Sequence, residues 1–310
     1  MATQKRTTPK KSQERPRREP ARQNRDGAPS RKPVERAPRP AVQRRPRTPH
    51  EPARSDPRTG RLVAGHGEEL LYGRHAVLEA LRAGRRHIRR IFLAEGTERS
   101  PILNEILAAA RLVGCALIET PRQRLDDAVP GNHQGVIAQA EEYSYVDLDA
   151  LLTATGDKLY LALDHLQDVQ NLGTLLRTAE AMGVTGVLLP GRRSAAVTPA
   201  VVNASAGAVE HLRIAQVGNL VQALEILKEN GVWAAGLEAV PEAIPLAKAD
   251  LSGPLVLVVG AEGAGLSRLV RERCDWLVSI PMAGKVESLN AAVAGSVVLI
   301  AARQARLAPA

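Results

Sequence analysis

The chain has 310 residues, 44% hydrophobic and 24% charged, which suits one large folded domain or two small ones. Aromatic residues make up only 2%, which disfavours a nucleic-acid surface built on rows of stacking rings; the two cysteines exclude a disulfide scaffold or a four-cysteine zinc site and favour a reducing compartment, the cytoplasm. No secretory signal is present at the N-terminus, and the longest charge-free apolar stretch, residues 288–302, is too short to cross a membrane.

The first 60 residues carry the basic charge of the chain. They hold 18 Lys and Arg against 6 Asp and Glu, whereas the remainder has a net charge of −3. They also hold 11 of the 21 prolines and no leucine, isoleucine or aromatic residue, so they cannot bury enough apolar surface to fold. We expect a disordered tail over residues 1–66. It is either a polybasic arm that neutralises RNA phosphates or a solvating extension, and its prolines argue against a transit peptide.

Residues 67–142 are expected to form a small α/β domain, because short helical and strand patterns alternate there. The expected helices are residues 74–82, 101–112 and 122–127, and the expected strands are residues 87–94, 115–119 and 135–140. Residues 143–157 follow as a polar linker with a short helix at 148–152. His133, in the turn before the last strand, is interpreted as a turn residue rather than a catalyst.

Residues 158–310 show a longer alternation that predicts a second, mostly parallel α/β sheet. The expected strands are residues 159–164, 186–190, 212–217, 232–237, 255–260 and 276–280. The expected helices are residues 173–182, 200–206, 220–229, 266–273 and 288–305. In such sheets ligands bind beyond the carboxyl ends of the strands, and three of these ends carry unusual residues.

The first segment follows the strand at 159–164. Asn171 stands where a helix N-cap is expected, and Arg177 shares the polar side of the following helix with Thr174 and Thr178. A capped helix with a solvated arginine would give the same pattern.

The second segment, residues 259–267, follows an entirely apolar strand and has three glycines in a G-x-x-G-x-G spacing. This is not a dinucleotide or P-loop pattern, and Glu262 would repel phosphate, so a neutral or cationic ligand fits better. An ordinary strand-to-helix turn is the alternative.

The third segment, residues 280–294, has a strand, a proline break, a glycine loop and a helix of small residues. Ser288 is the expected N-cap, with Asn290 in the first turn. The small residues suit a helix pressed into a cleft or a dimer interface, and equally a tightly packed C-terminal helix. The sequence has no zinc spacing of histidines and no nucleophile elbow.

Together the three segments resemble the SpoU branch of the SPOUT RNA ribose methyltransferases. The matching motifs are Asn171-Leu172-Gly173 with Arg177-Thr178-Ala179, the run from Gly260 to Ser267, and the run from Ile280 to Asn290. The segment Leu71–Val77 and the turn at 132–136 also resemble the family's N-terminal RNA-binding domain, which is similar to ribosomal protein L30e. That domain favours the 23S rRNA guanosine-2′-O-methyltransferase group over the tRNA group.

The resemblance implies an α/β-knot fold, in which the C-terminal segment makes a trefoil knot, and a homodimer with its active sites at the interface. It implies S-adenosylmethionine as cosubstrate, with no metal and no membrane partner. Cofactor binding falls to Gly260, Gly265, Ile280, Met282 and Leu289. Catalysis falls to Arg177, Asn171, Glu262, Ser288 and Asn290. The candidate RNA contacts are Arg74, Arg85, Arg86, Arg89 and Arg90, although the run from Arg85 to Arg90 could be a solvated edge.

The sequence departs from the family pattern at two places. Val169 stands where a proline is common, which alters loop stiffness, and Ala292 stands where a serine is common, which removes a hydroxyl. Arg177 is the family's candidate for assisting deprotonation of the ribose hydroxyl. A guanidinium is almost never neutral, so gripping a phosphate is the preferred role. Methylation of tRNA and a non-catalytic RNA-binding role are the alternatives to rRNA methylation.

Overall fold

The computed structural model describes residues 62–307. The basic segment at residues 1–61, with the disordered arm predicted for it, lies outside the described residues. Leu62 is only 5% exposed and joins Tyr72 and Phe92 in a buried cluster. The folded part therefore starts earlier than residue 67, where we expected it.

The first domain is a four-stranded sheet whose strands lie in the order β1–β4–β2–β3. β4 is antiparallel to β1 and β2, and β2 is parallel to β3. All three predicted helices and all three predicted strands are confirmed, but β1 was not predicted. The elements in chain order are β1 (Glu68–Tyr72), α1 (Arg74–Ala83), β2 (Ile88–Ala94), α2 (Pro101–Leu112), β3 (Ala116–Thr120), α3 (Arg122–Asp126) and β4 (Val136–Glu141).

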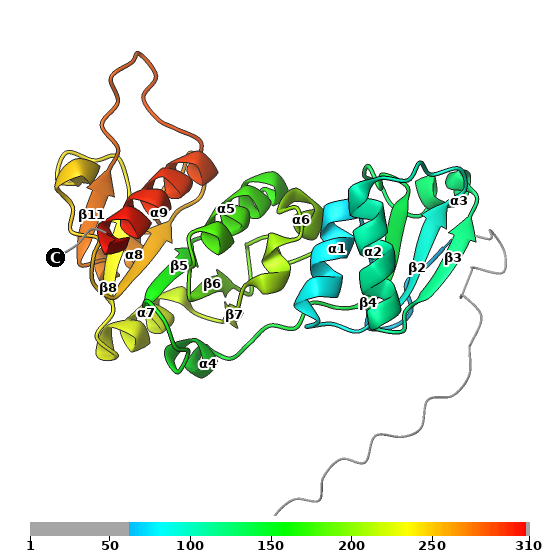
Figure 1. Ribbon diagram of the computed structural model, residues 1–310. Coiled ribbons are helices and arrows are strands. Elements are labelled where there is room, and N and C mark those ends of the chain that lie inside the picture. Colours follow the sequence, from blue (N-terminus) through cyan, green and yellow to red (C-terminus); the bar gives the residue numbers. More distant parts are fainter. Residues whose placement is uncertain (1–61, 308–310) are drawn as a thin grey trace, which may run out of the picture. The chain divides into compact units, whose positions relative to one another are not determined.

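The second domain is a seven-stranded parallel sheet in the order β7–β6–β5–β10–β8–β11–β9 (Figure 1). Helix α4 (Leu148–Leu152) lies in the connector, as predicted. The strands are β5 (Leu159–Leu163), β6 (Gly186–Pro190), β7 (Ile214–Val217), β8 (Trp233–Leu237), β9 (Ile244–Pro245), β10 (Leu255–Val259) and β11 (Trp276–Ser279). The helices are α5 (Val169–Ala181), α6 (Pro199–Ala204), η1 (Ala208–His211), α7 (Leu220–Glu229), η2 (Leu246–Lys248), α8 (Arg268–Arg273) and α9 (Ala291–Leu307).

The core of this domain has two layers, one on each face of the sheet. Every residue of β5 and β10 is buried, as expected for parallel strands covered on both sides. Leu161 and Leu257 join the cluster that includes residues of α5 and α9, whereas Tyr160 and Val256 join the cluster that includes residues of α7. Neighbouring residues of a strand thus serve opposite layers, which fixes the register of the sheet.

Helix α9 packs closely on α5 and β10 at Gly295. A side chain added there would bring its Cβ to 2.9 Å from Leu175 Cδ1 and 3.1 Å from Val259 Cγ2. The small residues at the start of α9 therefore allow a close approach to the sheet. This agrees with the tight packing that the sequence suggested.

Candidate active site

A cavity of about 580 Å³ opens at the carboxyl ends of β8, β10 and β11. Its size lies within the ordinary range for small-molecule sites, and its position is where ligands bind in parallel α/β sheets. All five residues predicted for cofactor binding line it: Gly260, Gly265, Ile280, Met282 and Leu289. Three of the five predicted catalytic residues also line it: Glu262, Ser288 and Asn290.

The loop after β10 owes its shape to two glycines. Ala261 and Gly265 exchange backbone hydrogen bonds of 3.1 and 2.9 Å, which close the loop on itself. Gly265 has φ +67°, a conformation that favours glycine, and a Cβ at Gly260 would overlap the carbonyl group of Gly265. The loop can therefore bring its backbone groups close to a ligand.

Glu238, directly after β8, also lines this cavity, although the sequence reading missed it. Arg271 Nε lies 3.3 Å from its Oε2, and the side chain is largely buried. A carboxylate here suits a ligand that carries positive charge. The sequence signal that could have identified Glu238 is its position directly after β8, at the same edge of the sheet as the loop after β10.

Asn171, Glu262 and Asn290, one from each motif, form a hydrogen-bonded chain. Asn171 Nδ2 donates to Glu262 Oε2 at 2.9 Å, and Asn290 Nδ2 donates to Asn171 Oδ1 at 2.8 Å. The three segments that seemed separate in the sequence thus meet at the wall of the cavity, through side chains that were predicted to be catalytic.

Two predicted helix caps were wrong. The actual caps explain how the side chains of Asn171, Glu262 and Asn290 come to be hydrogen-bonded to one another. Helix α5 starts earlier than expected, with Asp168 as N-cap accepting from the backbone N–H of Asn171 at 2.7 Å. Helix α9 starts later, and Asn290 Oδ1, not Ser288, accepts from the N–H groups of Ala292 and Val293 at 2.9 and 3.2 Å. The amide of Asn171 is therefore released from capping, and that of Asn290 is held rigidly.

Two family models match this chain. That of the SpoU rRNA methylase family matches residues 158–300, and that of the RNA 2′-O ribose methyltransferase substrate-binding domain matches residues 70–146. The putative TrmH family tRNA/rRNA methyltransferase YacO of Bacillus subtilis is 40% identical over 235 residues, covering 74% of this chain and 93% of YacO. The chain belongs to the SpoU methylase family. It is therefore an RNA methyltransferase by family.

Solved SpoU methyltransferases share the fold. AviRb from Streptomyces viridochromogenes, crystallised in complex with the cofactor AdoMet, matches with a TM-score of 0.66 at 28% identity, over 78% of this chain and 92% of AviRb. An AdoMet-bound rRNA methyltransferase from Sinorhizobium meliloti matches with a TM-score of 0.65 at 27% identity, over 77% and 88% of the two chains. The predicted fold class, a SpoU-type α/β-knot methyltransferase, is confirmed.

Arg177, the remaining catalytic candidate of the SpoU motifs, stands apart from this chain of side chains. It is exposed on α5, and six residues of helix place it about 9 Å along the axis from Asn171. It does not line the cavity after β10, and it takes no part in the hydrogen bonds among Asn171, Glu262 and Asn290. Ser288 lies exposed in the loop before α9. The structure therefore brings together Asn171, Glu262 and Asn290, and leaves Arg177 on the neighbouring surface.

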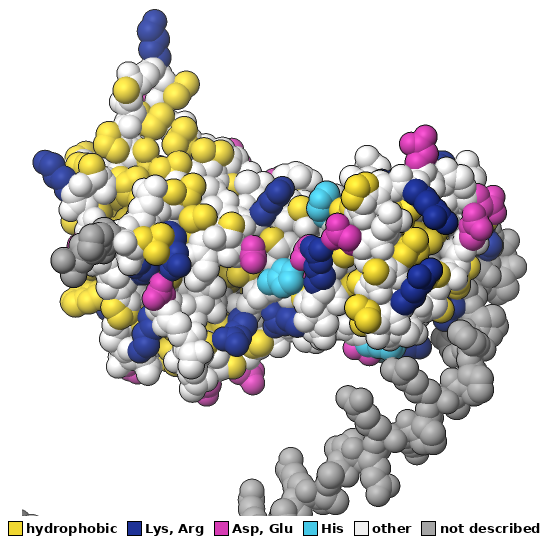
Figure 2. Space-filling model, in the orientation of Figure 1, with side chains coloured by type: hydrophobic (Ala, Val, Ile, Leu, Met, Phe, Trp, Pro, Cys, Tyr) yellow, Lys and Arg dark blue, Asp and Glu magenta, His cyan; other side chains and the backbone are white. Residues whose placement is uncertain are grey.

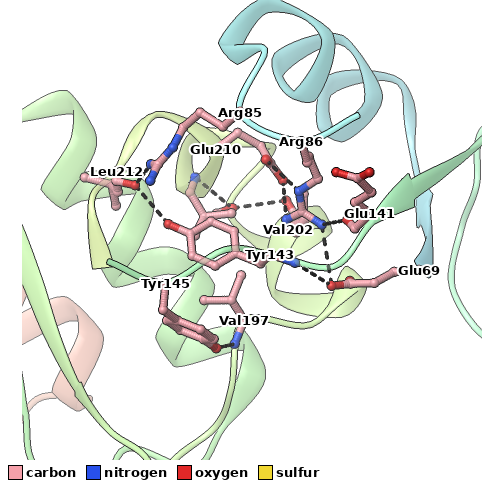
Figure 3. Close-up of polar contacts among 12 residues, drawn as sticks. Glu69, Arg85, Arg86, Glu141, Tyr143, Tyr145, Val197, Val202, Glu210 and Leu212 are labelled. Carbon is pink, nitrogen blue, oxygen red and sulfur yellow. Dashed lines mark hydrogen bonds and ion pairs between the residues drawn. The ribbon is translucent and has the colours of Figure 1, made fainter. Parts of the chain in front are cut away.

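Among the arginines predicted to contact RNA, Arg86 is buried at the junction of the two domains (Figure 3). Its Nη2 lies 2.8 Å from Glu210 Oε1, and the two side chains are 2% and 1% exposed. Its Nη1 lies 3.5 Å from Glu69 Oε1 and donates to the carbonyl of Glu141 at 3.2 Å. Burial raises the pKa of Glu210, and the Arg86 charge opposes that shift. Arg86 is thus a structural residue, and neither RNA contact nor a solvated edge describes it.

Arg85 and the connector complete this junction. The Arg85 guanidinium lies 5.7 Å from the centre of the Tyr143 ring and donates to the carbonyl of Leu212. Tyr143 Oη donates to the same carbonyl at 2.9 Å, and burial raises the pKa of Tyr143 to about 12. Tyr145 Oη accepts from the N–H of Val197 at 2.9 Å. The connector is therefore bonded to the second domain.

The other predicted RNA contacts lie on the first domain. Arg74 Nε donates to the carbonyl of Gln134 at 3.0 Å, so it holds the turn that carries His133. His133 is buried in that turn, with Nε2 2.8 Å from Asp126 Oδ1, which agrees with its interpretation as a turn residue. Arg89 is half exposed beside Glu68, and Arg90 is half-buried. Arg89 keeps the freest surface position of this set.

Neither cysteine is suited to nucleophilic chemistry. Burial raises the pKa of Cys115 to about 11 and that of Cys274 to about 12, so both thiols stay protonated near neutral pH. Within residues 62–307, no three metal-ligating side chains gather, and no helix is long and apolar enough to cross a membrane. The hydrogen-bonded chain at the cavity wall is thus the best-formed candidate for the chemistry.

Proposed function

We propose that this SpoU-family chain transfers a methyl group from S-adenosylmethionine to the 2′-hydroxyl of a ribose in RNA, with a guanosine of 23S rRNA as target. The observation that carries the proposal is the contact of Asn171, Glu262 and Asn290 at the wall of the glycine-lined cavity. The substrate-binding domain match at residues 70–146 supports a ribose hydroxyl as acceptor. The reaction takes place in the cytoplasm, in line with the two unpaired cysteines.

The cavity fits the cosubstrate. Gly260 and Gly265 leave room for a ligand against the backbone, and Ile280, Met282 and Leu289 offer apolar contacts. Glu238 also lines the cavity, and its carboxylate, which pairs with Arg271, can accept hydrogen bonds from the ligand. When bound there, S-adenosylmethionine supplies an electrophilic methyl group with its own leaving group.

The chain's own residues position the acceptor. Asn171 and Glu262 are fixed to each other, so together they can hold a ribose in one orientation relative to the cavity. Asn290 keeps Asn171 in place, and Ser288 belongs to the loop that closes over the cavity. Arg177 carries a permanent charge on the adjoining surface, so it grips the target phosphate and polarises the hydroxyl. These roles align oxygen, carbon and sulfur and exclude water.

The protein acts as a homodimer that pairs through α9. Val293, Val297 and Ile300 are exposed and lie on one stripe of the helix at helical spacing. Figure 2 shows hydrophobic side chains gathered over α9 and the adjoining loop. Such a patch is typical of a protein–protein interface. The first domain binds RNA through Arg89, Arg90 and Arg74, and the basic segment before it adds phosphate contacts.

The test is incubation of the purified full chain with labelled S-adenosylmethionine and pools of unmodified rRNA and tRNA. We expect label in 23S rRNA, on a ribose, and the modified guanosine can be mapped by its resistance to alkaline cleavage. Label in tRNA alone would show that tRNA, and not 23S rRNA, is the substrate. Absence of label from both pools, with S-adenosylhomocysteine bound in calorimetry, would leave a non-catalytic RNA-binding protein.

A further inference from the structure

A second cavity, of about 520 Å³, adjoins the one described above. The loop after β10 is common to both, because Ala261, Glu262, Ala264 and Gly265 line both cavities. Asn171 lines the second cavity only, and its amide reaches Glu262 in the shared wall. A group in the second cavity would therefore lie next to a ligand in the first.

His165 lines this second cavity and is held in an uncommon conformation. Its φ is +62°, in the left-handed region that residues other than glycine seldom adopt, histidine being among those found there more often. Its Nδ1 lies 2.6 Å from Oδ1 of Asp164, which is 1% exposed. The other carboxylate oxygen of Asp164 accepts from the backbone N–H of Ser267 at 2.6 Å. Asp164 thus ties the end of β5 to the loop after β10 and fixes the imidazole.

The hydrogen bond to Asp164 decides which nitrogen of His165 is available. A carboxylate accepts from Nδ1–H, so in the neutral ring Nε2 carries the lone pair. The imidazole is 38% exposed, so Nε2 can accept a hydrogen bond from a ligand in the cavity. A buried carboxylate that orients a partly exposed imidazole is a common arrangement at sites where histidine binds or reacts.

Arg193, in the loop after β6, lines the same cavity and also has a left-handed φ, of +58°. Its side chain is exposed, and within residues 62–307 no carboxylate neutralises it. Among the described residues, four other than glycine have a positive φ, and two of them line this cavity. Backbone strain of this kind concentrates at functional sites.

We propose that the second cavity receives the target nucleotide, with His165 Nε2 accepting a hydrogen bond from the nucleoside and Arg193 binding its phosphate. This inference rests on the proposed function, since it assigns the RNA half of the same active site. It gives the chain a substrate contact, His165, beyond the residues of the three motifs. Asp164 is then a positioning residue that acts through His165.

The test uses substitutions that keep the backbone. In His165→Asn, the amide nitrogen can still donate to Asp164 and asparagine tolerates the left-handed conformation, but the acceptor at Nε2 is lost. Arg193→Asn removes the charge in the same way. Arg192→Asn is the matched control, because Arg192 is exposed next to Arg193 and does not line the cavity. Steady-state methylation of rRNA and calorimetry with S-adenosylhomocysteine are measured for each.

We expect His165→Asn and Arg193→Asn to raise KM for RNA about tenfold while the Kd of S-adenosylhomocysteine stays within about twofold of wild type. Arg192→Asn should change neither. An unchanged KM and kcat in His165→Asn, with active wild type, would overturn the inference and leave the proposed function standing. Weaker S-adenosylhomocysteine binding in His165→Asn would overturn it too, by assigning the cavity to the cofactor. A wild-type chain that methylates no RNA would overturn both this inference and the proposed function.

Discussion

Two polar clusters in this protein use similar side chains for opposite purposes. At the domain junction, Arg86 and Glu210 are buried and form an ion pair, with Glu69 beside them. At the sheet edge, Asn171 and Glu262 also bond to each other, but they line a cavity. A polar cluster closed on all sides holds domains together, whereas one with an open side can bind a substrate. The surroundings, rather than the residue types, decide the role.

The largest effect should come from breaking the closed cluster. Arg86→Met leaves Glu210 buried without its partner, so the free energy of unfolding should fall by about 3–5 kcal/mol. Urea denaturation measures this. The double variant Arg86→Met with Glu210→Leu should recover most of the loss. Arg82→Met, in helix α1 four residues before Arg86 and in exposed ion pairs, is the control and should change stability by about 1 kcal/mol or less.

Breaking the open cluster should affect the reaction and spare stability. Asn171→Ala removes the group that links Glu262 to Asn290, so kcat should fall about a hundredfold, with little change in Tm. Asn203→Ala is the matched control from the junction, where Asn203 Nδ2 donates to the carbonyl of Tyr72 at 3.0 Å. That variant should lose stability and keep kcat. A reversed pattern in these two asparagines would contradict the comparison.

The reaction rates of the two cysteine thiols measure how well each domain protects its buried cysteine. Burial raises the pKa of Cys115 from 9.0 to about 11 and that of Cys274 to about 12. Only the thiolate reacts with iodoacetamide, so at pH 8 Cys115 in the folded protein should react about a hundredfold more slowly than in the unfolded chain. Both rates should rise with pH towards these pKa values. Equal rates in native and denaturing buffer would show that neither thiol is protected.

The smallest effect concerns the apolar stripe of α9. Ile300→Asp places a charge in the proposed dimer interface, so the dimer dissociation constant should rise by about tenfold or more. Sedimentation equilibrium measures this change. Leu112→Asp is the control, since Leu112 is 89% exposed on α2 of the other domain and should leave association unchanged. A wild-type chain that sediments as a monomer would contradict the dimer directly.

The strands could be predicted because their signals are local, and β10 is apolar at every position. The glycine spacing after β10 left an ordinary turn open, and only the resemblance of three motifs to one family singled out this loop as a cofactor site. The first residues of the helices were harder to predict from the sequence. Asp168, Asn171, Ser288 and Asn290 are all competent N-caps, and only the contacts between the segments decide which of them cap.

Long-range partners explain the remaining differences. β1 begins with Glu68 and Glu69, and two adjacent charges disguise a strand. Their ion-pair partners are Arg89 in β2 and Arg86 in the segment before β2. The role of Arg86 was equally hidden, because its partner Glu210 lies 124 residues away. Glu238 directly follows the predicted strand at 232–237, but only the fold brings it beside the loop after β10 in the same cavity. Patterns along the chain report burial well, but they do not report which distant group compensates a charge.

The loop from Gly260 to Gly265 lines both the cavity proposed for S-adenosylmethionine and the cavity proposed for the target nucleotide. Any shift of its backbone towards one occupant changes the room left for the other, so the free energies of the two binding events are linked. Thermodynamic reciprocity then requires RNA to alter the affinity for S-adenosylhomocysteine by the same factor by which S-adenosylhomocysteine alters the affinity for RNA. On the proposed assignment of the two cavities, S-adenosylhomocysteine and RNA therefore each change the affinity of the protein for the other.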